Sequence, residues 1–252
     1  MKKLLFLIMI MPIAGVFSQT KNMYSVGLMQ PKIGQTQAFE AAWKAHLIKY
    51  HNGESKRQVF EIVSGDNAGY YQLVDGPIGF ADMDKETPDS KTHDLDIYST
   101  ISPKIAVEKM GNTYRWVDTL SHNYSEVTAS KYMQTNYYVK PGMMPDFMKE
   151  MRRSVLINEE IKNPSSYRAY VLTYAGSKPV LVIRTALKDG FKQLEPGYLP
   201  STTAAFKTAY IKKYGQPEWD KMRASGTAVY TLVNEVETML VKHRTDLSSS
   251  IK

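Results

Sequence analysis

The chain of 252 residues contains no cysteine. Without cysteine there can be no disulfide framework, no cysteine-based metal site and no cysteine nucleophile. A lipid-anchored lipoprotein is excluded as well, because its signal ends at the cysteine that carries the lipid. We therefore expect the chain to be held together by its hydrophobic core alone.

Several catalytic signatures are also absent. The sequence has no Gly-x-Ser-x-Gly elbow, no phosphate-binding glycine loop and no His-Glu-x-x-His helix. Each of these motifs provides a definite local geometry, for a serine nucleophile, a nucleotide phosphate or a zinc ion respectively. Hydrolysis by these routes is not expected.

The only pronounced apolar run lies at the N-terminus. Two lysines precede apolar residues 4–13, and a proline and a glycine then interrupt the helix before the position that a signal peptidase reads. A membrane anchor is the alternative, but it would need about 20 apolar residues. We expect residues 1–18 to be a signal peptide that is cleaved between Ser18 and Gln19. The mature protein is then periplasmic or secreted, without membrane contact.

Positive charge is in mild excess and is not concentrated. The formal net charge of +7 becomes +5 when the two lysines of the signal peptide are removed. The basic residues are spread along the chain, whereas nucleic-acid binders gather them on one face among stacking aromatics. We therefore expect no nucleic-acid partner.

The apolar periodicity predicts a series of elements that occurs twice: strand, helix, strand, strand, helix, strand. In residues 35–50, Phe39, Trp43, Leu47 and Tyr50 recur at spacings of four, four and three, which places them on one face of a helix. The elements expected in the first copy are strands 23–30, 57–64, 70–75 and 113–120, helix 35–50, and a helix between 94 and 110.

The second copy repeats this order. The elements expected there are strands 131–139, 167–174, 180–187 and 235–243, a helix from 145 to 163, and a helix 201–214 with an extension at 219–222. Gly34 precedes Phe39 in the first copy as Gly142 precedes Phe147 in the second. The glycine lets the backbone turn at the strand-to-helix corner, and the aromatic ring pins the helix on the sheet.

Asp-Gly also ends the third strand of each copy, at residues 75–76 and 189–190. These matches favour a duplication into two units, 19–125 and 126–252. A βαββαβ unit forms a four-stranded antiparallel sheet with both helices on one face, the ferredoxin-like arrangement. The other face must also be buried. We therefore expect an α+β protein in which the two antiparallel sheets pack face to face as an intrachain α+β barrel.

The duplicated unit and the Gly-x-x-x-x-Phe corner resemble the dimeric α+β barrel superfamily. The resemblance is to a tandem-repeat member akin to the antibiotic-biosynthesis monooxygenases and NIPSNAP-like proteins, and it covers nearly the whole chain after the signal peptide. It implies a ligand in a cleft between the helices and the sheet. A shared fold does not by itself assign a reaction.

The haem-binding members of this superfamily supply a pattern for comparison. The haem-degrading relatives have an Asn on the first strand, a Trp near the third and a His on the second helix. Asn136 fits the first position in the second copy, but no His lies near that copy's second helix, and His93 in the first copy lacks the Asn and the Trp. A chlorite-dismutase-like site needs a proximal His in the second copy, where only His243 is present, on a strand. No cofactor is therefore expected.

An acidic segment at residues 82–96 offers oxygen ligands for a metal. Its spacing matches no calcium loop, in which alternate positions and a distal Glu coordinate the ion around a central Gly. Acidic residues near a helix N-terminus are favourable without a metal. We interpret the segment as solvated and expect no bound metal. The residues concerned are Asp82, Asp84, Asp89, His93, Asp94 and Asp96.

His46 is the candidate catalytic residue. It lies on the same helical stripe as Phe39 and Trp43, facing the predicted cleft, and its counterpart in the second copy is Ser154. The alternative is a structural histidine whose hydrogen bonds are satisfied.

Tyrosine is abundant, with 17 residues, and several tyrosines alternate along predicted strands. One face of strand 131–139 combines tyrosines with amides, which suits a flat organic ligand because the rings give contact and the polar tips give orientation. The alternative is an inter-sheet core. The ligand-binding candidates are Trp43, His46, Tyr70, Tyr132, Gln134, Asn136 and Tyr138.

Three functions remain open. The first is an exported protein that binds a small aromatic or hydrophobic organic ligand in the helix–sheet cleft. The second is a cofactor-independent monooxygenase or oxidase, in which His46 and nearby tyrosines deprotonate and orient the substrate. The third is a non-catalytic protein-interaction module. We prefer the binding function because the catalytic set implied by the resemblance is incomplete.

Overall fold

The computed structural model describes residues 21–51, 57–85, 90–124, 129–174, 178–198, 201–223 and 231–249. The predicted signal peptide and Asp89 of the acidic segment lie outside these residues. Within the described ranges, no helix is both long and apolar enough to cross a membrane.

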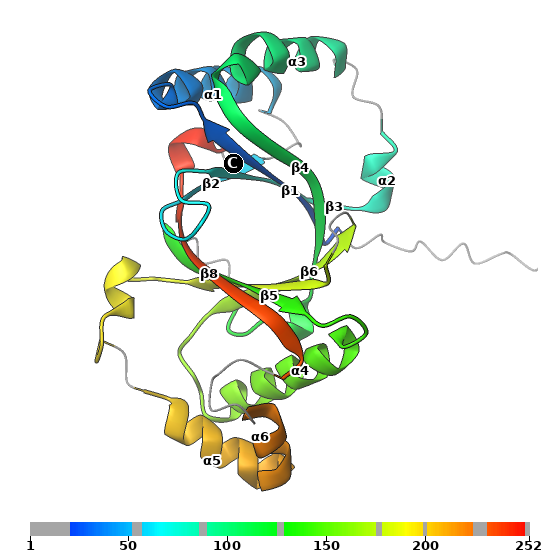
Figure 1. The fold of residues 1–252 in the computed structure, drawn as a ribbon, viewed down its shortest axis with the longest axis vertical. Helices are drawn as coiled ribbons and strands as arrows, with labels where there is room; N and C mark the ends of the chain where they lie inside the picture. Colours follow the sequence, from blue (N-terminus) through cyan, green and yellow to red (C-terminus); the bar gives the residue numbers. More distant parts are fainter. Residues whose placement is uncertain are drawn as a thin grey trace, which may run out of the picture.

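Antiparallel strands close into a barrel, which Figure 1 shows end-on between two layers of helices. Neighbouring strands follow the order β1-β3-β2-β8-β5-β7-β6-β4, and β4 pairs with β1 to close the ring. The strands are β1 (Met23–Pro31), β2 (Arg57–Ile62), β3 (Tyr71–Ile78), β4 (Ile105–Trp116), β5 (Lys131–Val139), β6 (Tyr167–Tyr174), β7 (Val180–Ala186) and β8 (Val233–His243). The predicted α+β class with two tandem ferredoxin-like units is confirmed, and the two sheets join edge to edge.

Two equivalent seams join the halves of the barrel. β2 of the first half pairs with β8 through residues 60–62 and 241–243, and β6 of the second half pairs with β4 through residues 170–174 and 113–116. In each seam the second strand of one half meets the last strand of the other. The barrel interior is therefore shared by both halves.

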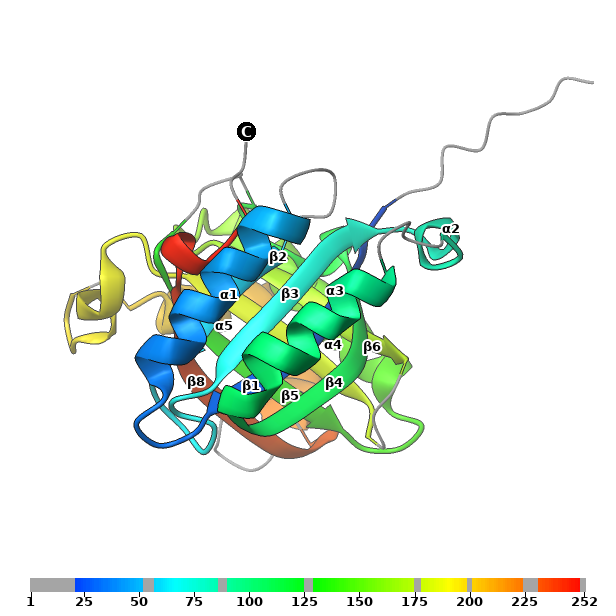
Figure 2. The ribbon, with the colours of Figure 1, turned by 90° about the horizontal axis from the view of Figure 1, so that it is seen from above.

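The helices cover the outer faces of the barrel. They are α1 (Thr36–Tyr50), α2 (Phe80–Met83), α3 (Ser90–Asp96), α4 (Met144–Glu160), α5 (Thr203–Tyr214) and α6 (Gln216–Arg223), with a π-helical turn at Ile97–Ile101 and short 3-10 turns at 102–104, 118–120, 190–194 and 245–247. α1 and α3 lie next to each other over the first half, as Figure 2 shows from above. α4 packs on the second half, and α5 and α6 lie outside it (Figure 1).

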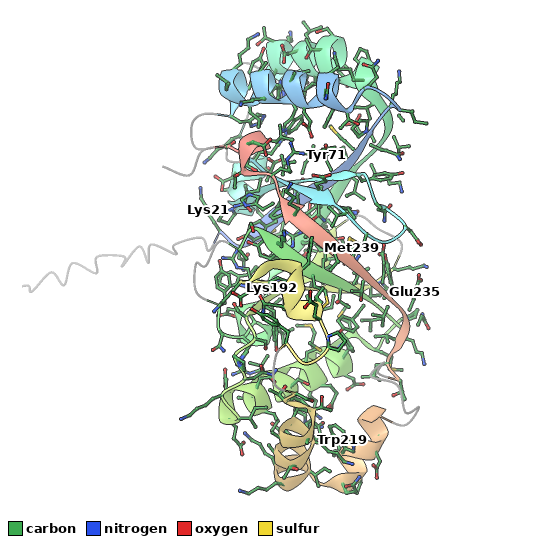
Figure 3. The ribbon with its side chains drawn as sticks, turned by 90° about the vertical axis from the view of Figure 1, so that its left-hand side faces the viewer. Lys21, Tyr71, Lys192, Trp219, Glu235 and Met239 are labelled. Atoms are coloured by element: carbon green, nitrogen blue, oxygen red, sulfur yellow. The ribbon has the colours of Figure 1, made fainter. Side chains whose placement is uncertain are left out.

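The glycine corners have the geometry that the sequence predicts. Gly34 and Gly142 adopt positive φ angles of 76° and 78°, a region that side chains disfavour. Phe39 and Phe147 follow them and are buried between helix and sheet. Figure 3 shows the layers from the side, with Tyr71 near the helix-facing surface of the first half and Trp219 in the outermost layer.

The sequence prediction and the structure differ at both ends of β4, which begins at Ile105 and ends at Trp116. The helical segment continues through the 3-10 turn at 102–104, which contains Pro103, and ends at its C-cap, Ile105. Ile105 and Val107 lie in the range within which the helix was expected, but they pair with β1 at the start of β4. Residues 118–120, expected in a strand, form a 3-10 turn that buries Leu120.

Candidate functional site

A cavity of about 560 Å³ lies inside the barrel. Alternation along the strands creates it, because one set of side chains packs under the helices and the other set points inward. On β7, for example, Leu181 and Ile183 belong to the core under α4, whereas Val182 and Arg184 line the cavity. The aromatic residues of the lining are Tyr24, Phe60, Tyr114, Tyr124, Tyr132, Tyr167 and Tyr170.

Arg184 is the central polar group of this cavity. Its Nη2 donates hydrogen bonds to the side-chain oxygens of Gln72 and Gln134, the latter at 2.7 Å. The guanidinium carbon lies 4.3 Å from the centre of the Phe60 ring. Part of the side chain faces the open space of the cavity, while the surrounding protein desolvates the guanidinium and lowers its pKa. Its buried Nε has no hydrogen-bond partner.

Arg168 lies directly opposite Arg184 on the neighbouring strand β6. It also lines the cavity, its guanidinium carbon lies 3.3 Å from the centre of the Tyr124 ring, and its Nε is buried without a hydrogen-bond partner. Like charges directly opposite each other destabilise an antiparallel pair. None of the described residues that line the cavity is an Asp or a Glu. The cavity thus holds two cations whose charge its own lining does not neutralise.

The other polar groups of the lining are neutral. Burial raises the pKa of Tyr24, Tyr114 and Tyr132, so these phenols keep their protons near neutral pH. His243 at the end of β8 stacks on Phe60 with ring centres 4.9 Å apart. Burial, together with Arg184, lowers its pKa, which favours a neutral imidazole. The site therefore combines two cations with hydrogen-bonding groups that carry no charge.

A chain of two amides on β5 leads from Arg184 to a carboxylate on β8. Gln134 accepts from Arg184 and donates to Asn136 at 3.1 Å. Asn136 donates to Glu237 at 2.9 Å, and the hydroxyl of Tyr138 donates to the same oxygen at 3.0 Å. Glu237 thus accepts the last hydrogen bonds of this series and does not form an ion pair with Arg168 or Arg184.

The structure separates the ligand-binding candidates into three groups. Tyr132 and Gln134 line the cavity. Asn136 and Tyr138 share their strand face but contact Glu237, and Tyr70 packs at the edge of an interior hydrophobic cluster. Of this set, the two residues on α1 lie outside the barrel: Trp43 and His46.

Trp43 and His46 correct the expected position of the ligand space. The gap between α1 and the sheet is filled by a cluster that includes Phe39, Trp43 and Leu47, so the main cavity is inside the barrel and not between helix and sheet. His46 is fully buried beside Trp43, and burial lowers its pKa against the opposing effect of Asp96. It does not line the cavity.

Sequence analysis missed the arginines and the inward role of His243. A usable signal was present for Arg184, because a single charged residue follows the apolar run Val-Leu-Val-Ile of strand 180–187. Arg168 gave no such signal, since its partner across the strands and the absence of acids around it depend on the register.

Comparisons with known proteins bear on the fold. No protein-family model and no curated protein sequence matches the chain. A candidate monooxygenase from Lactobacillus acidophilus aligns with a TM-score of 0.51 at 8% identity, over 90% of this chain and 95% of that one. A candidate monooxygenase from Fusobacterium nucleatum gives 0.51 at 10% identity, over 88% and 91%. An anthrone oxidase-like protein gives 0.52 at 9% identity, over 89% and 92%.

These likenesses concern architecture, because so few residues are identical. The chain has the fold of the dimeric α+β barrel superfamily, the group that the duplicated unit and its glycine corners resemble. Both halves of the barrel are contributed by the one chain.

Proposed function

We propose that this is an exported protein that binds a small, flat organic anion inside the barrel. The observation that carries the proposal is the pair Arg168 and Arg184, which face one cavity on neighbouring strands without a carboxylate in its lining. A buried charge is costly unless it is paired, so a ligand with a carboxylate, sulfonate or phenolate would stabilise the site by pairing with the arginines. The cavity volume of about 560 Å³ suits a drug-sized molecule.

The surrounding groups support an aromatic ligand. Gln72 and Gln134 orient the Arg184 guanidinium, which leaves its other N–H groups for the ligand's charged group. The tyrosine rings offer flat apolar contact, and their protonated hydroxyls can donate hydrogen bonds. Export is inferred from the N-terminal residues alone.

The anion preference can be tested with two fluorescent probes of similar shape. Anilinonaphthalene sulfonate is an aromatic anion, and N-phenylnaphthylamine is the corresponding neutral molecule. We expect Arg184→Met to weaken binding of the sulfonate at least tenfold, about 1.4 kcal/mol, because a charge-assisted hydrogen bond is lost. Binding of the neutral probe should change little. Fluorescence titration of both probes gives the affinities.

Lys212→Met is the matched control, since it removes one positive charge from the exposed surface of α5. It should leave sulfonate binding unchanged. Equal affinity of the sulfonate for the wild type and Arg184→Met would refute the anion site.

Oxidation of a bound phenol is a second candidate function. The specific observation is His243, a cavity-lining imidazole with a lowered pKa that stacks on Phe60. His243 would accept the proton of a phenol, or of the CH2 group of an anthrone, and Arg184 would stabilise the phenolate that results. Dioxygen would oxidise this phenolate; with an anthrone, one oxygen atom becomes the new quinone carbonyl and the other leaves as water. The fold shared with monooxygenase-like and anthrone oxidase-like proteins is compatible with this chemistry.

Anthrone is a suitable test substrate for this second function. We expect oxygen consumption with the wild type and a loss of at least tenfold in kcat with His243→Gln, because the proton acceptor is removed. An oxygen electrode measures the rate. A wild type that binds anthrone without consuming oxygen would leave binding as the function, and full activity in His243→Gln would exclude His243 as the base.

A further inference from the structure

Three histidines from distant parts of the chain meet in the helix layer of the first half. His46 lies on α1, His51 follows its last residue, and His93 lies on α3. Their ring centres are 4.7 to 5.3 Å apart, and one ring nitrogen from each lies within 4.8 Å of the other two. Figure 2 shows α1 and α3 next to each other outside the barrel, so this cluster is separate from the cavity.

One pair of these nitrogens has the spacing of two ligands on a tetrahedral metal ion. Nε2 of His51 and Nε2 of His93 are 3.3 Å apart. Two imidazole nitrogens bound to zinc at about 2.0–2.1 Å in tetrahedral geometry would be separated by roughly 3.3–3.4 Å. The pair thus already has the separation of two adjacent ligands.

The carboxylates around the cluster orient the rings as they do in metal centres. Nδ1 of His46 lies 2.7 Å from an oxygen of Asp96, and Nδ1 of His93 lies 3.1 Å from an oxygen of Asp94. A metal-binding histidine commonly donates its second ring N–H to a carboxylate, which fixes the tautomer and the ring orientation. In both residues the carboxylate takes Nδ1 and leaves Nε2 for an ion.

His46 provides the independent observation. Its side chain is 0% exposed, and its Nε2 is buried without a hydrogen-bond partner. A buried polar atom normally has a partner, so this nitrogen needs an explanation. A metal ion between the three rings satisfies it.

We propose that His46, His51 and His93 bind a divalent transition-metal ion, with Zn²⁺ as the ion to be tested. Neutral imidazoles suit zinc and its neighbours in the first row, and hard ions such as Mg²⁺ and Ca²⁺ prefer oxygen ligands. The His93 side chain is 25% exposed, so the cluster is accessible from solvent on that side. Asp96 is a positioning residue that acts through His46.

The earlier expectation of no metal concerned the acidic segment. Of that segment, the described cluster uses His93 as a ligand and Asp94 and Asp96 as hydrogen-bond acceptors. Asp82, which lies in α2, instead pairs with Lys21 and Lys85. The sequence did not reveal the site because its ligands come from three positions with no motif spacing.

The test uses the purified chain after treatment with EDTA and dialysis. We expect isothermal titration to give one Zn²⁺ per chain, and Co²⁺ substitution to give the visible bands of tetrahedral cobalt. His93→Asn should abolish the Co²⁺ bands and weaken Zn²⁺ binding at least tenfold, and circular dichroism checks that this partly exposed position tolerates the change. Asp96→Asn should weaken binding about 10- to 100-fold while one ion per chain is retained.

His243→Gln is the matched control, because it removes a histidine from the barrel and leaves the cluster intact. It should bind Zn²⁺ like the wild type. The proposal is overturned if the wild type binds no Zn²⁺, or if folded His93→Asn binds Zn²⁺ with unchanged affinity and stoichiometry. Neither result would bear on the arginine cavity, because none of these three histidines lines it.

Discussion

At the scale of single residues, Arg244 joins three elements through one carboxylate. Its Nη1 lies 2.5 Å from an oxygen of Glu40 on α1, and the hydroxyl of Tyr71 on β3 donates to the same oxygen at 2.5 Å. The hydrogen bond from Arg244 is the main cause that holds the pKa of Glu40 below its usual value, while burial opposes it. Glu40 is 24% exposed, so solvent screens part of this interaction.

Glu40→Gln should therefore destabilise the protein in a pH-dependent way. Because the pKa of Glu40 is lower in the folded state, its contribution is present above the unfolded pKa and is lost as the pH falls through the folded pKa. We expect the variant to be less stable by about 1 kcal/mol at neutral pH, with a difference that shrinks in acid. Urea denaturation of the wild type and the variant, at neutral pH and in acid, measures the difference in the free energy of unfolding.

Glu160→Gln is the control for that experiment. Glu160 is 43% exposed and lies 3.5 Å from Lys213, an arrangement that contributes little to stability. Its effect should be small at either pH. A Glu40→Gln effect of equal size in acid and at neutral pH would show that packing, and not the charge, is responsible.

The residues of the site differ in how far the sequence could predict them. The strand period of two correctly groups Tyr132, Gln134, Asn136 and Tyr138 on one face, because alternation is a local property. It does not say whether that face meets a helix or the barrel interior. Arg184 can be recognised as part of an anion site only when Arg168 is placed opposite it. That strand register depends on contacts between residues that are not neighbours in the sequence.

At the scale of elements, helix α1 was predictable and the first part of β4 was not. The stripe of Phe39, Trp43 and Leu47 has a single helical period, and the glycine corner marks its start. Residues 105–110 carry no comparable pattern, and they form a strand because the edge of β1 pairs with them. Tertiary pairing decides such segments.

The turns after β4 and β8 have a role that local sequence does not reveal. Leu247 follows the last strand of the second half but packs in the core under α1, and Trp43 Nε1 donates to its carbonyl oxygen at 3.1 Å. Leu120 follows the last strand of the first half but packs in the core under α4. Each half thus completes the helix-side core of the other.

At the scale of the whole molecule, this exchange and the two seams make the halves interdependent. A half on its own would expose the edges of two strands and the inward face of its sheet. Its helix-side core would also lack the leucine that the other half supplies, Leu247 or Leu120. Unpaired strand edges and uncovered apolar surface favour aggregation over folding. The duplication visible in the sequence therefore marks two structural repeats that share one barrel.

We predict that fragments 19–125 and 126–252 fold only together. Co-expressed, they should elute as a 1:1 complex in size-exclusion chromatography, whereas each fragment alone should lack cooperative unfolding. Leu247→Asp in the second fragment should prevent assembly, because it places a charge in the core under α1. Leu194→Asp, at a position that is 42% exposed, should not. A folded, monomeric fragment with a cooperative transition would contradict the shared core, since each repeat would then bury its apolar surface unaided.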